Sequence, residues 1–485
     1  MLKLMDETLL RADAYVGGAW TAAPKRFVVR NPATGETLAE VADLDAAAAR
    51  RAIETAHAAL PAWRARTAKE RAGLMRKWFE LILANQEDLA RIMTAEQGKP
   101  IAETRGEVAY GASFIEWFAE EGERIYGDVI PTFAPGKRII VTKEPVGVVA
   151  AITPWNFPNA MITRKAAPAL AAGCTFLIKP PAETPLSALA LAALAHRAGI
   201  PGGVFNVVTS DQHVDVGKEF TTSPLVRKFS FTGSTEVGKL LMAQCASTIK
   251  KVSLELGGNA PFIVFDDADL DAAIEGAMLS KYRNMGQTCV CANRILVQDS
   301  VYDAFAAKLK ARVETMKVGN GMDDGVVQGP LINEDAVEKV ERLLGQATAK
   351  GAKVLIGGHR HTLGRTFFEP TILSGATPDM DIAQEEIFGP VATLFRFGDE
   401  AEAVRIANAT QYGLAAYFYA RDIGRVMRVA EALEYGMVAI NEGILSTEVA
   451  PFGGVKQSGI GREGSKYGIE DYLEIKYLLL GGLST

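Results

Sequence analysis

Apolar residues recur at intervals of three and four positions across residues 45–95, with charged residues between them. The segments LDAAAARRAIETAHAALPAWRA and KERAGLMRKWFELILANQEDLARIMTAE show this spacing most clearly. Such spacing places the apolar side chains on one face of an α-helix. The pattern therefore predicts that residues 45–95 form helices.

The pattern changes from residue 145, where short apolar runs rich in β-branched residues alternate with helical segments. The runs are VGVVAAIT, CTFLIKP, GVFNVVT and VRKFSFTG, and the helical segments include TPLSALALAALAHRAG and VGKLLMAQCA. This alternation is typical of a parallel sheet with helices on both faces. Later runs, NAPFIVF, NRILVQ and AKVLIGG, predict a second α/β unit at about residues 256–465.

The C-terminal stretch YLEIKYLLLGGL alternates between apolar and polar residues and then becomes wholly apolar. An exposed strand of this kind favours aggregation unless another strand covers it. We therefore expect this stretch to contribute to contacts between subunits.

Composition and charge limit the classes of partner. The chain has 52 Lys and Arg residues and 58 Asp and Glu residues, and its formal net charge of -6 indicates no basic surface for nucleic acid or an anionic membrane. No stretch reaches the roughly 18 apolar residues of a membrane span, and the N-terminus lacks the apolar core of a signal peptide. We expect a cytoplasmic protein with a small-molecule partner and with no nucleic-acid or membrane partner.

Two of the four cysteines, Cys289 and Cys291, lie one residue apart in RNMGQTCVCANR. The other two, Cys174 and Cys245, lie in apolar surroundings typical of small buried residues, so we expect no disulfide framework. No second CxxC or His-x-His pair accompanies Cys289, so we expect no metal. A nucleophilic thiol would need a base or a positive field, because the thiolate is the form that attacks a carbonyl, and no histidine lies in a recognisable catalytic stretch.

Glu255 in SLELGGNAP is the candidate general base. Its neighbours Leu254 and Leu256 are apolar, and apolar surroundings raise the pKa of a carboxyl group towards the working range of a base. A glutamate at a strand end that faces solvent would have the same spacing, so this segment alone supports both interpretations.

Two further segments combine a strand end with residues suited to anion binding. In FTGSTEVG, Gly233 and Gly238 frame a strand-to-helix turn that could hold a phosphate, although GxGxxG is absent and an ordinary βα turn would look the same. In ITPWNFP, two prolines stiffen the loop around Asn156, whose side-chain N–H could stabilise an oxyanion. An Asx turn that closes the strand is the alternative for Asn156.

Taken together and in this order, the segments PWNFP, LIKP, FTGSTEVG, LELGGNAP, GQTC, EEIFGP and PFGGVKQSGIGREGS resemble the aldehyde dehydrogenase superfamily, from about residue 15 to the C-terminus. The resemblance implies an α/β fold with a Rossmann-like cofactor domain, an α/β catalytic domain and a small β oligomerisation arm. The expected boundaries are 1–122 and 142–254 for the cofactor domain, 255–465 for the catalytic domain, and 123–141 with 466–485 for the arm. Through this arm the resemblance implies a homodimer or a homotetramer.

The resemblance also implies NAD(P)-dependent oxidation of an aldehyde. Cys289 of GQTC would form a thiohemiacetal with the substrate, and Asn156 and the backbone N–H of Cys289 would form the oxyanion hole. After hydride transfer to the nicotinamide, Glu255 would activate the water that hydrolyses the thioester. Lys165 matches a lysine that the superfamily keeps near this site.

For the cofactor, the resemblance assigns Lys179 and Glu386 to the ribose hydroxyls and Phe388 to packing against the nicotinamide. It assigns Ser234 to the pyrophosphate and Trp155 to the lining of the cleft. The other residues of the expected cofactor site are Thr153, Ala182, Gly233 and Leu256.

Ala182 bears on the choice between NADP and NAD. Relatives that prefer NAD often carry a glutamate here, which accepts from the 2′-hydroxyl of the adenine ribose and repels a 2′-phosphate. In LIKPPAETP the position is alanine and Glu183 follows it, so Lys179 is free to meet a phosphate. We expect NADP to be preferred over NAD, with Glu183 as the opposing feature.

Within the superfamily, the chain is most similar to the succinate semialdehyde dehydrogenases. Arg164 and Arg283 would clamp a carboxylate at the far end of a short substrate, because the planar guanidinium matches carboxylate geometry, and Ser446 would add a hydroxyl. The expected substrate is a four-carbon aldehyde with an ω-carboxylate, succinate semialdehyde, with glutarate semialdehyde as the close alternative. Pairing of either arginine with an internal carboxylate is the competing interpretation.

Cys291 suggests a redox switch, in which it traps an oxidised Cys289 in a strained and readily reduced disulfide. The alternative is a small buried residue.

A function of another class, a cysteine-dependent acyl hydrolase without nicotinamide, conflicts with the cofactor segments. A CoA-acylating relative would leave Glu255 without a hydrolytic role.

Overall fold

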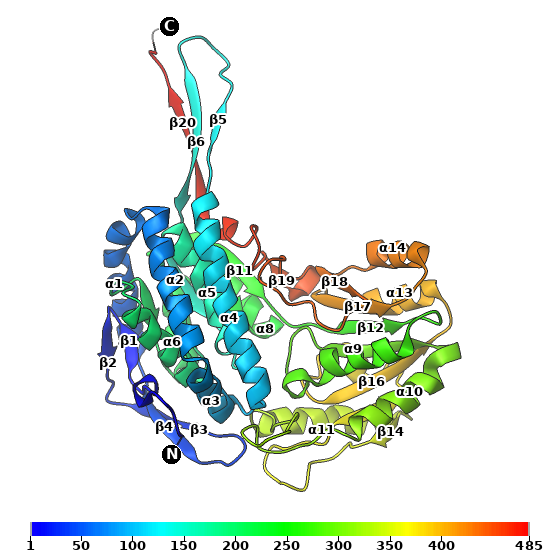
Figure 1. Cartoon of the computed structure of the whole chain (residues 1–485). Coiled ribbons are helices and arrows are strands. Elements are labelled where there is room, and N and C mark those ends of the chain that lie inside the picture. Colours follow the sequence, from blue (N-terminus) through cyan, green and yellow to red (C-terminus); the bar gives the residue numbers. More distant parts are fainter. Residues whose placement is uncertain (1, 484–485) are drawn as a thin grey trace.

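The computed structural model describes residues 2–483, which form two α/β units and an extended arm (Figure 1). Blue to green segments build one unit, green to orange segments build the other, and the arm projects from the first unit beside the C-terminus. The mixed α/β architecture predicted from the sequence is confirmed. None of the helices in this part of the chain is long and apolar enough to cross a bilayer.

The first unit contains an eight-stranded sheet with the order β19-β11-β10-β7-β8-β9-β1-β2. Its five central strands run parallel, and the strands at both edges pair antiparallel. Every residue of β8 is buried, as expected for a strand that helices cover on both faces. The strands are β1 (Ala14–Val16), β2 (Ala19–Thr21), β7 (Val148–Ile152), β8 (Thr175–Lys179), β9 (Phe205–Val207), β10 (Val226–Thr232), β11 (Lys251–Glu255) and β19 (Gly459–Ile460).

Helices α1 to α8 belong to this unit, and the predicted helices across residues 45–95 are confirmed as the first three of them. Asp45 caps α1 by accepting from the backbone N–H of Ala48, and Thr67 and Glu70 form a capping box at the start of α2. The helices are α1 (Ala46–Arg64), α2 (Ala68–Ala84), α3 (Gln86–Gln97), α4 (Ile101–Glu121), α5 (Ala160–Ala172), α6 (Pro185–Arg197), α7 (His213–Thr222) and α8 (Thr235–Cys245). A hairpin of β3 (Arg26–Arg30) and β4 (Thr37–Ala42) completes the unit.

The second unit contains a seven-stranded sheet with the order β14-β15-β16-β13-β12-β17-β18, in which only the edge strand β14 pairs antiparallel. The predicted strands NAPFIVF, NRILVQ and AKVLIGG correspond to β12, β13 and β14. The strands are β12 (Ala260–Val264), β13 (Ala292–Gln298), β14 (Lys353–Ile356), β15 (Thr371–Ser374), β16 (Val391–Phe397), β17 (Ala415–Tyr419) and β18 (Met437–Ile440). The helices are α9 (Leu270–Tyr282), α10 (Asp299–Val313), α11 (Glu334–Ala349), α12 (Asp381–Gln384), α13 (Glu400–Asn408) and α14 (Ile423–Ala432).

The arm is a three-stranded antiparallel sheet of β5 (Asp128–Ile130), β6 (Arg138–Pro145) and β20 (Leu473–Leu480). β20 pairs with β6 along its whole length, so β6 extends beyond the expected boundary at residue 141. Ile475 and Tyr477 on β20 are 70% and 56% exposed. The expected contact between subunits through this arm stays a prediction, as do the domain boundaries.

Several predicted site residues lie at the carboxyl ends of parallel strands in the first sheet, where open α/β sheets bind their ligands. Thr153 follows β7, Lys179 ends β8, Gly233 follows β10 and Glu255 ends β11. β19 comes from the C-terminal part of the chain and pairs with β11 at Glu255. Segments from distant parts of the sequence therefore meet at this edge of the sheet.

Candidate active site

Cys289 lies on the loop between α9 and β13, in a stretch with an unusual backbone. Asn284 and Met285, which precede it, have positive φ angles of 50° and 55°. The segment after β11 packs directly against this loop, because a Cβ atom added to Gly258 would lie 2.2 Å from the carbonyl oxygen of Cys289. This close approach requires glycine at position 258 and explains the second glycine of LELGG.

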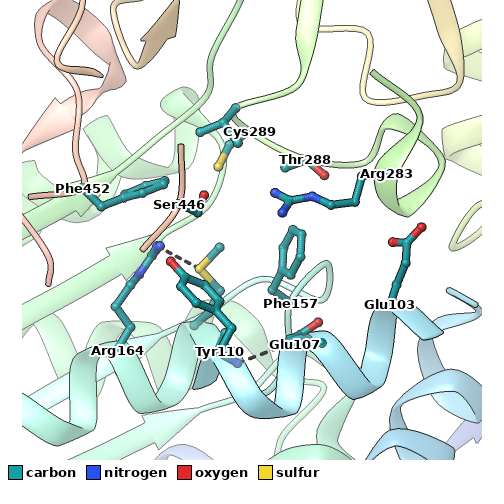
Figure 2. A pocket seen from close by; sticks show the side chains of 14 residues that line it. Glu103, Glu107, Tyr110, Phe157, Arg164, Arg283, Thr288, Cys289, Ser446 and Phe452 are labelled. Carbon is teal, nitrogen blue, oxygen red and sulfur yellow. Dashed lines mark hydrogen bonds between the residues drawn. The ribbon is translucent and has the colours of Figure 1, made fainter. Parts of the chain in front are cut away.

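Two cavities meet at Cys289, which lines both of them. The first encloses about 290 Å³ and contains the three predicted substrate residues. The second encloses about 340 Å³ and contains most of the predicted cofactor residues. Figure 2 shows Cys289 at the edge of the first cavity, with Ser446, Arg164 and Arg283 around the same space. The thiol therefore lies between two compartments.

The resting thiol of Cys289 is held in its protonated form. Burial raises the pKa of Cys289 to about 12, and the carboxyl groups of Glu386 and Glu255 act in the same direction. The guanidinium groups of Arg164 and Arg283 oppose this shift in the pKa. Attack on a carbonyl at neutral pH therefore requires a proton acceptor or an added positive charge beside the sulfur.

Asn156 is buried on the loop between β7 and α5, and it lines the second cavity together with Cys289. Its Nδ2 donates to the carbonyl oxygen of Gln287 at 3.1 Å, which leaves the second N–H of the amide for another acceptor. Within residues 2–483, no hydrogen bond is formed by the backbone N–H of Cys289. Both predicted oxyanion donors therefore have a free N–H.

A buried polar network that the sequence analysis missed holds the Asn156 loop. The carbonyl oxygen of Asn156 accepts from Lys99 Nζ at 2.7 Å and from Asn284 Nδ2 at 3.0 Å. Lys99 pairs with Glu107 at 2.5 Å, and both side chains are fully buried. Glu107 also accepts from the backbone N–H of Asn159 at 3.0 Å, just before α5. The segment QGKP around Lys99 follows an ordinary helix, so its sequence gives no sign of this role.

Glu255 is only 2% exposed, which excludes the interpretation that it faces solvent. In the described part of the chain, neither of its carboxyl oxygens has a hydrogen-bond partner. Burial, followed by the negative charge of Glu463, raises the pKa of Glu255 well above its ordinary value. A Cβ atom added to Gly453 would lie 2.9 Å from Glu255 Oε1, so the backbone closes over one side of the carboxyl group. These properties suit a general base.

Glu463 is a second buried carboxylate that the sequence analysis did not assign. It forms ion pairs with Arg164 and Lys165, which are neighbours on the fully buried helix α5. Burial acts to raise the pKa of Glu463, but Arg164 and Lys165 outweigh it and lower this pKa below its ordinary value. Glu463 lies in the quoted segment GREGS, so its position was visible in the sequence and its partners were not.

Arg164 and Arg283 differ in whether an internal carboxylate neutralises their charge. Arg164 has the internal carboxylate partner Glu463, which the sequence analysis considered as an alternative, and its guanidinium carbon lies 4.3 Å from the centre of the Phe452 ring. For Arg283, no carboxylate within residues 2–483 lies within ion-pair distance, and its guanidinium carbon lies 5.4 Å from the centre of the Phe157 ring. Both arginines line the first cavity with Ser446. Arg283 therefore carries the less compensated charge.

The second cavity suits a dinucleotide. Glu386 Oε1 accepts from the backbone N–H of Gly258 at 3.1 Å, and burial raises the pKa of Glu386 to about 7. Phe388 contacts Trp155 edge to face, with ring centres 5.5 Å apart. Ser234 caps α8, whose positive end suits a pyrophosphate. The predicted cofactor residues that line this cavity are Trp155, Gly233, Ser234, Leu256, Glu386 and Phe388.

The other predicted cofactor residues lie at the ends of β7 and β8. Lys179 is buried, and burial lowers the pKa of its ammonium group to about 8. Its Nζ lies 3.1 Å from Nδ1 of His213, a residue to which the sequence analysis gave no role. Thr153 donates its backbone N–H to the carbonyl oxygen of Lys179 at 3.4 Å. Ala182 lines a separate hollow.

Cys291 is buried and packs against α9 rather than projecting into either cavity. Its Sγ lies 3.3 Å from Nζ of Lys281 and 3.4 Å from the carbonyl oxygen of Lys281. Burial raises the pKa of the Cys291 thiol. A disulfide with Cys289 would require this sulfur to leave Lys281, and the redox hypothesis stays a prediction. Cys174 and Cys245 are buried thiols, as predicted.

Comparison with known proteins agrees with the motifs. The chain is 65% identical to the glutarate-semialdehyde dehydrogenase of Pseudomonas aeruginosa, over 99% of this chain and 100% of that protein. It is 62% identical to the 3-sulfolactaldehyde dehydrogenase of Pseudomonas putida, over 100% of both chains. It is also 62% identical to the succinate-semialdehyde dehydrogenase (NADP(+)) GabD of Escherichia coli, over 99% of this chain and 100% of that protein.

Structural comparison gives the same result. The crystal structure of succinate-semialdehyde dehydrogenase from Burkholderia pseudomallei matches with a TM-score of 0.98 at 63% identity, covering 99% of this chain and 100% of that one. The family model described as "Aldehyde dehydrogenase family" matches residues 20–478. The resemblance predicted from the motifs is confirmed, and the chain belongs to the aldehyde dehydrogenase family.

Proposed function

We propose that this aldehyde dehydrogenase oxidises a short aldehyde with an ω-carboxylate, with succinate semialdehyde as its main substrate and NADP as its preferred cofactor. The observation that carries the proposal is the position of Cys289 between two cavities of different chemistry. The first cavity contains the side chains of Arg164 and Arg283. The second cavity contains most of the residues expected to hold a dinucleotide.

In the first half of the reaction, the sulfur of Cys289 attacks the aldehyde carbon, its proton passes to solvent, and the C=O π bond opens to an oxyanion as the C–S bond forms. The N–H groups of Asn156 Nδ2 and of the Cys289 backbone donate to the oxygen on which negative charge develops. The cofactor, when bound, supplies a nicotinamide ring that accepts a hydride. A thioester on Cys289 is the product of this half.

In the second half, Glu255 accepts a proton from the water molecule that attacks the thioester. The C–S bond breaks, the carboxylic acid leaves, and Cys289 regains its thiol proton. A carboxyl group with an ordinary pKa would be a weak base at neutral pH, whereas the raised pKa of Glu255 favours proton transfer from water.

The two arginine side chains of the first cavity favour a carboxylate at the far end of the substrate; Glu103 and Glu107 also line this cavity, and Glu107 is paired with Lys99. Arg283 is half-buried beside the Phe157 ring, so it can offer its N–H groups without first breaking an ion pair. Arg164 can contribute only the part of its guanidinium group that Glu463 does not bind. Ser446 adds a hydroxyl from the loop after β18. We therefore assign the larger share of carboxylate binding to Arg283.

The names of similar proteins point to more than one length of substrate. Three proteins that are 62–65% identical in sequence to this chain are named for glutarate semialdehyde, 3-sulfolactaldehyde and succinate semialdehyde. All three names denote short aldehydes with an anionic end, which agrees with the arginine-lined cavity. One methylene group changes binding by only about 1–3 kcal/mol, so glutarate semialdehyde is the second candidate.

The preference for NADP rests on Ala182 and Lys179. Ala182 leaves no carboxylate at the position from which a glutamate would repel a 2′-phosphate. The Escherichia coli relative carries NADP(+) in its name. Glu183, which is exposed beside Ala182, is the feature that opposes this preference.

Steady-state formation of reduced cofactor with succinate semialdehyde, glutarate semialdehyde and an uncharged aldehyde of similar length tests the substrate assignment. We expect the two carboxylated aldehydes to have the higher kcat/KM. Arg283→Gln should lower kcat/KM for them about 10- to 100-fold, the cost of a hydrogen bond to a charged group, and should leave the uncharged aldehyde nearly unchanged. Arg51→Gln, on the exposed face of α1, is the matched control.

If the uncharged aldehyde is oxidised as efficiently as the carboxylated ones, the substrate assignment is wrong and the family chemistry still holds. Arg164→Ala should also remove the preference for a carboxylate. That variant gives a less direct answer, because it leaves Glu463 with Lys165 as its only ion-pair partner among the described residues.

Replacement of Ala182 tests the cofactor assignment. Ala182→Glu places a carboxylate beside the 2′-phosphate, and like-charge contact costs several kcal/mol, so kcat/KM with NADP should fall about tenfold or more relative to NAD. Ala182→Gln has the same size without the charge and should retain most of the NADP activity. Equal cofactor ratios in the two variants would show that the preference is determined elsewhere.

Glu255→Gln separates the two halves of the reaction. Rapid mixing should still show a burst of reduced cofactor from thioester formation, while steady-state turnover falls about 10²- to 10⁴-fold. Because the pKa of Glu255 is raised, turnover of the parent should increase with pH above the ordinary titration range of a carboxyl group, and this increase should be absent from the variant. Glu431→Gln, on the surface of α14, should behave like the parent in both respects. Loss of the burst would assign Glu255 to the first half.

Peroxide treatment tests the redox hypothesis. If Cys291 captures oxidised Cys289, inactivation of the parent should be reversed by thiol, and inactivation of Cys291→Ala should be largely irreversible. Mass spectrometry of the peptide that contains both cysteines would detect the disulfide. Cys245→Ala, at a buried position on α8, is the control. Equal recovery of Cys291→Ala and the parent would contradict the switch.

A further inference from the structure

Lys179 and His213 form a close pair of nitrogen groups at the cofactor end of the first sheet. Lys179 is the last residue of β8 and His213 is the first residue of α7, and their Nζ and Nδ1 atoms are 3.1 Å apart. Lys179 is 3% exposed, whereas the side chain of His213 is 59% exposed. An anion that binds Nζ of Lys179 on the side of His213 can therefore also contact the imidazole.

The surroundings of this pair suit an anion. His213 is the first residue of α7, whose N-terminus has no side-chain cap, so the positive end of the helix dipole lies at this residue. Next to the pair, Ala182, Glu183 and Asp211 line a hollow of about 310 Å³ together with Arg30 and Glu96. The small side chain of Ala182 leaves room there for a group as large as a phosphate.

Because carboxylates surround the pair, the protonation of His213 affects how strongly this site attracts a phosphate. Three carboxylates act on Lys179, those of Glu183 after β8, Asp211 before α7 and Asp43 after β4. Arg30 and Glu96 also line the neighbouring hollow, so with a neutral imidazole the ammonium group of Lys179 and the guanidinium group of Arg30 are the cations that oppose these carboxylates. A proton on His213 adds a further positive charge, and it replaces the contact in which the neutral Nδ1 accepts from Lys179 by two donors that can both face the phosphate.

We infer that His213 is a specificity-determining residue for NADP, which as an imidazolium contacts the 2′-phosphate beside Lys179 and so makes the choice between NADP and NAD depend on pH. The inference rests on the proposed function, because it takes Lys179 to bind the adenine ribose. It goes beyond that proposal by assigning the second ligand of the phosphate and its dependence on a proton.

The direction of the pH dependence follows from the groups that face His213. Burial and the positive charge of Lys179 lower the pKa of His213, and Asp211, Glu183 and Asp43 oppose this shift. Asp211 Oδ1 lies 3.4 Å from Nε2 of His213 and can hold the ring in place. A bound 2′-phosphate adds negative charge and raises the pKa of His213, so NADP binds together with a proton. Affinity for the 2′-phosphate is therefore highest at low pH and falls as the pH rises through the pKa of His213 in the complex.

Equilibrium binding tests this without turnover. Isothermal titration of the full chain with adenosine 2′,5′-bisphosphate and with adenosine 5′-monophosphate, from about pH 5.5 to about pH 8.5, covers the range in which histidine titrates. The parent should lose about tenfold or more of its affinity for the bisphosphate across this range. The monophosphate lacks the 2′-phosphate and should show a much smaller change.

Three variants isolate the imidazole. His213→Gln should bind the bisphosphate weakly at every pH, and His213→Lys, with a permanent charge, should bind it at high pH more tightly than the parent does. The phosphate itself ionises near pH 6, but this contribution is common to all the proteins and cancels when they are compared. His359→Gln, at an exposed position after β14, is the matched control and should follow the parent.

If His213→Gln binds the bisphosphate as the parent does at each pH, the inference is wrong. Failure of the parent to discriminate the bisphosphate from the monophosphate at any pH would also overturn it. The first result leaves the proposed preference for NADP standing, whereas the second contradicts it as well. The proposed oxidation of the aldehyde is measured separately, by NAD-linked turnover of the semialdehyde. Because His213 is largely exposed at the first position of a helix, both substitutions are compatible with folding, and thermal unfolding of each variant verifies this.

Discussion

The ion pairs of Glu463 with Arg164 and Lys165 lie in the interior of the molecule, and the active site depends on them. Buried cations are strongly destabilising unless an anion accompanies them, so α5 can carry two adjacent charges only while Glu463 is present. Glu463 is supplied by the segment after β19, which adds an edge strand beside β11. The charge cluster therefore fixes the C-terminal part of the chain against the helix that lies under the substrate cavity.

The same cluster determines the chemistry of Glu255. Its carboxyl group is buried near Glu463, which is held ionised by two cations, and a second negative charge beside the first is unfavourable. The proton of the pair is therefore placed on Glu255. An ion pair that stabilises the fold thus separates the two carboxyl groups into a permanent anion and a group that can exchange protons. The backbone also packs closely around both groups, because an added Cβ atom would lie 2.9 Å from Glu255 Oε1 at Gly453 and 2.2 Å from the carbonyl oxygen of Cys289 at Gly258.

Much of the fold and the centre of the site could be predicted from the sequence, because their signals are local. Strands and helices alternate with clear periodicity, and Cys289 lies within a short recognisable segment. The supporting residues could not be predicted, because their partners are distant. Lys165 and Glu463 are 298 positions apart, and Lys179 and His213 are 34 positions apart on elements that only the sheet order brings together. Neither composition nor periodicity contains information about such pairs.

The two ends of the site differ in the kind of charge that they present. At the substrate end the cations are guanidinium groups, which stay charged at any pH at which the protein is folded. At the cofactor end they are the ammonium group of Lys179, whose pKa burial lowers to about 8, and the imidazole of His213, whose pKa burial also lowers. In the proposed reaction, a change in pH near neutrality would therefore leave the recognition of an anionic aldehyde intact and would alter the charge that faces the adenine ribose. The two proposed binding functions would thus respond differently to pH, because one relies on guanidinium groups and the other on an ammonium group and an imidazole. They also occupy different cavities, with Cys289 between them.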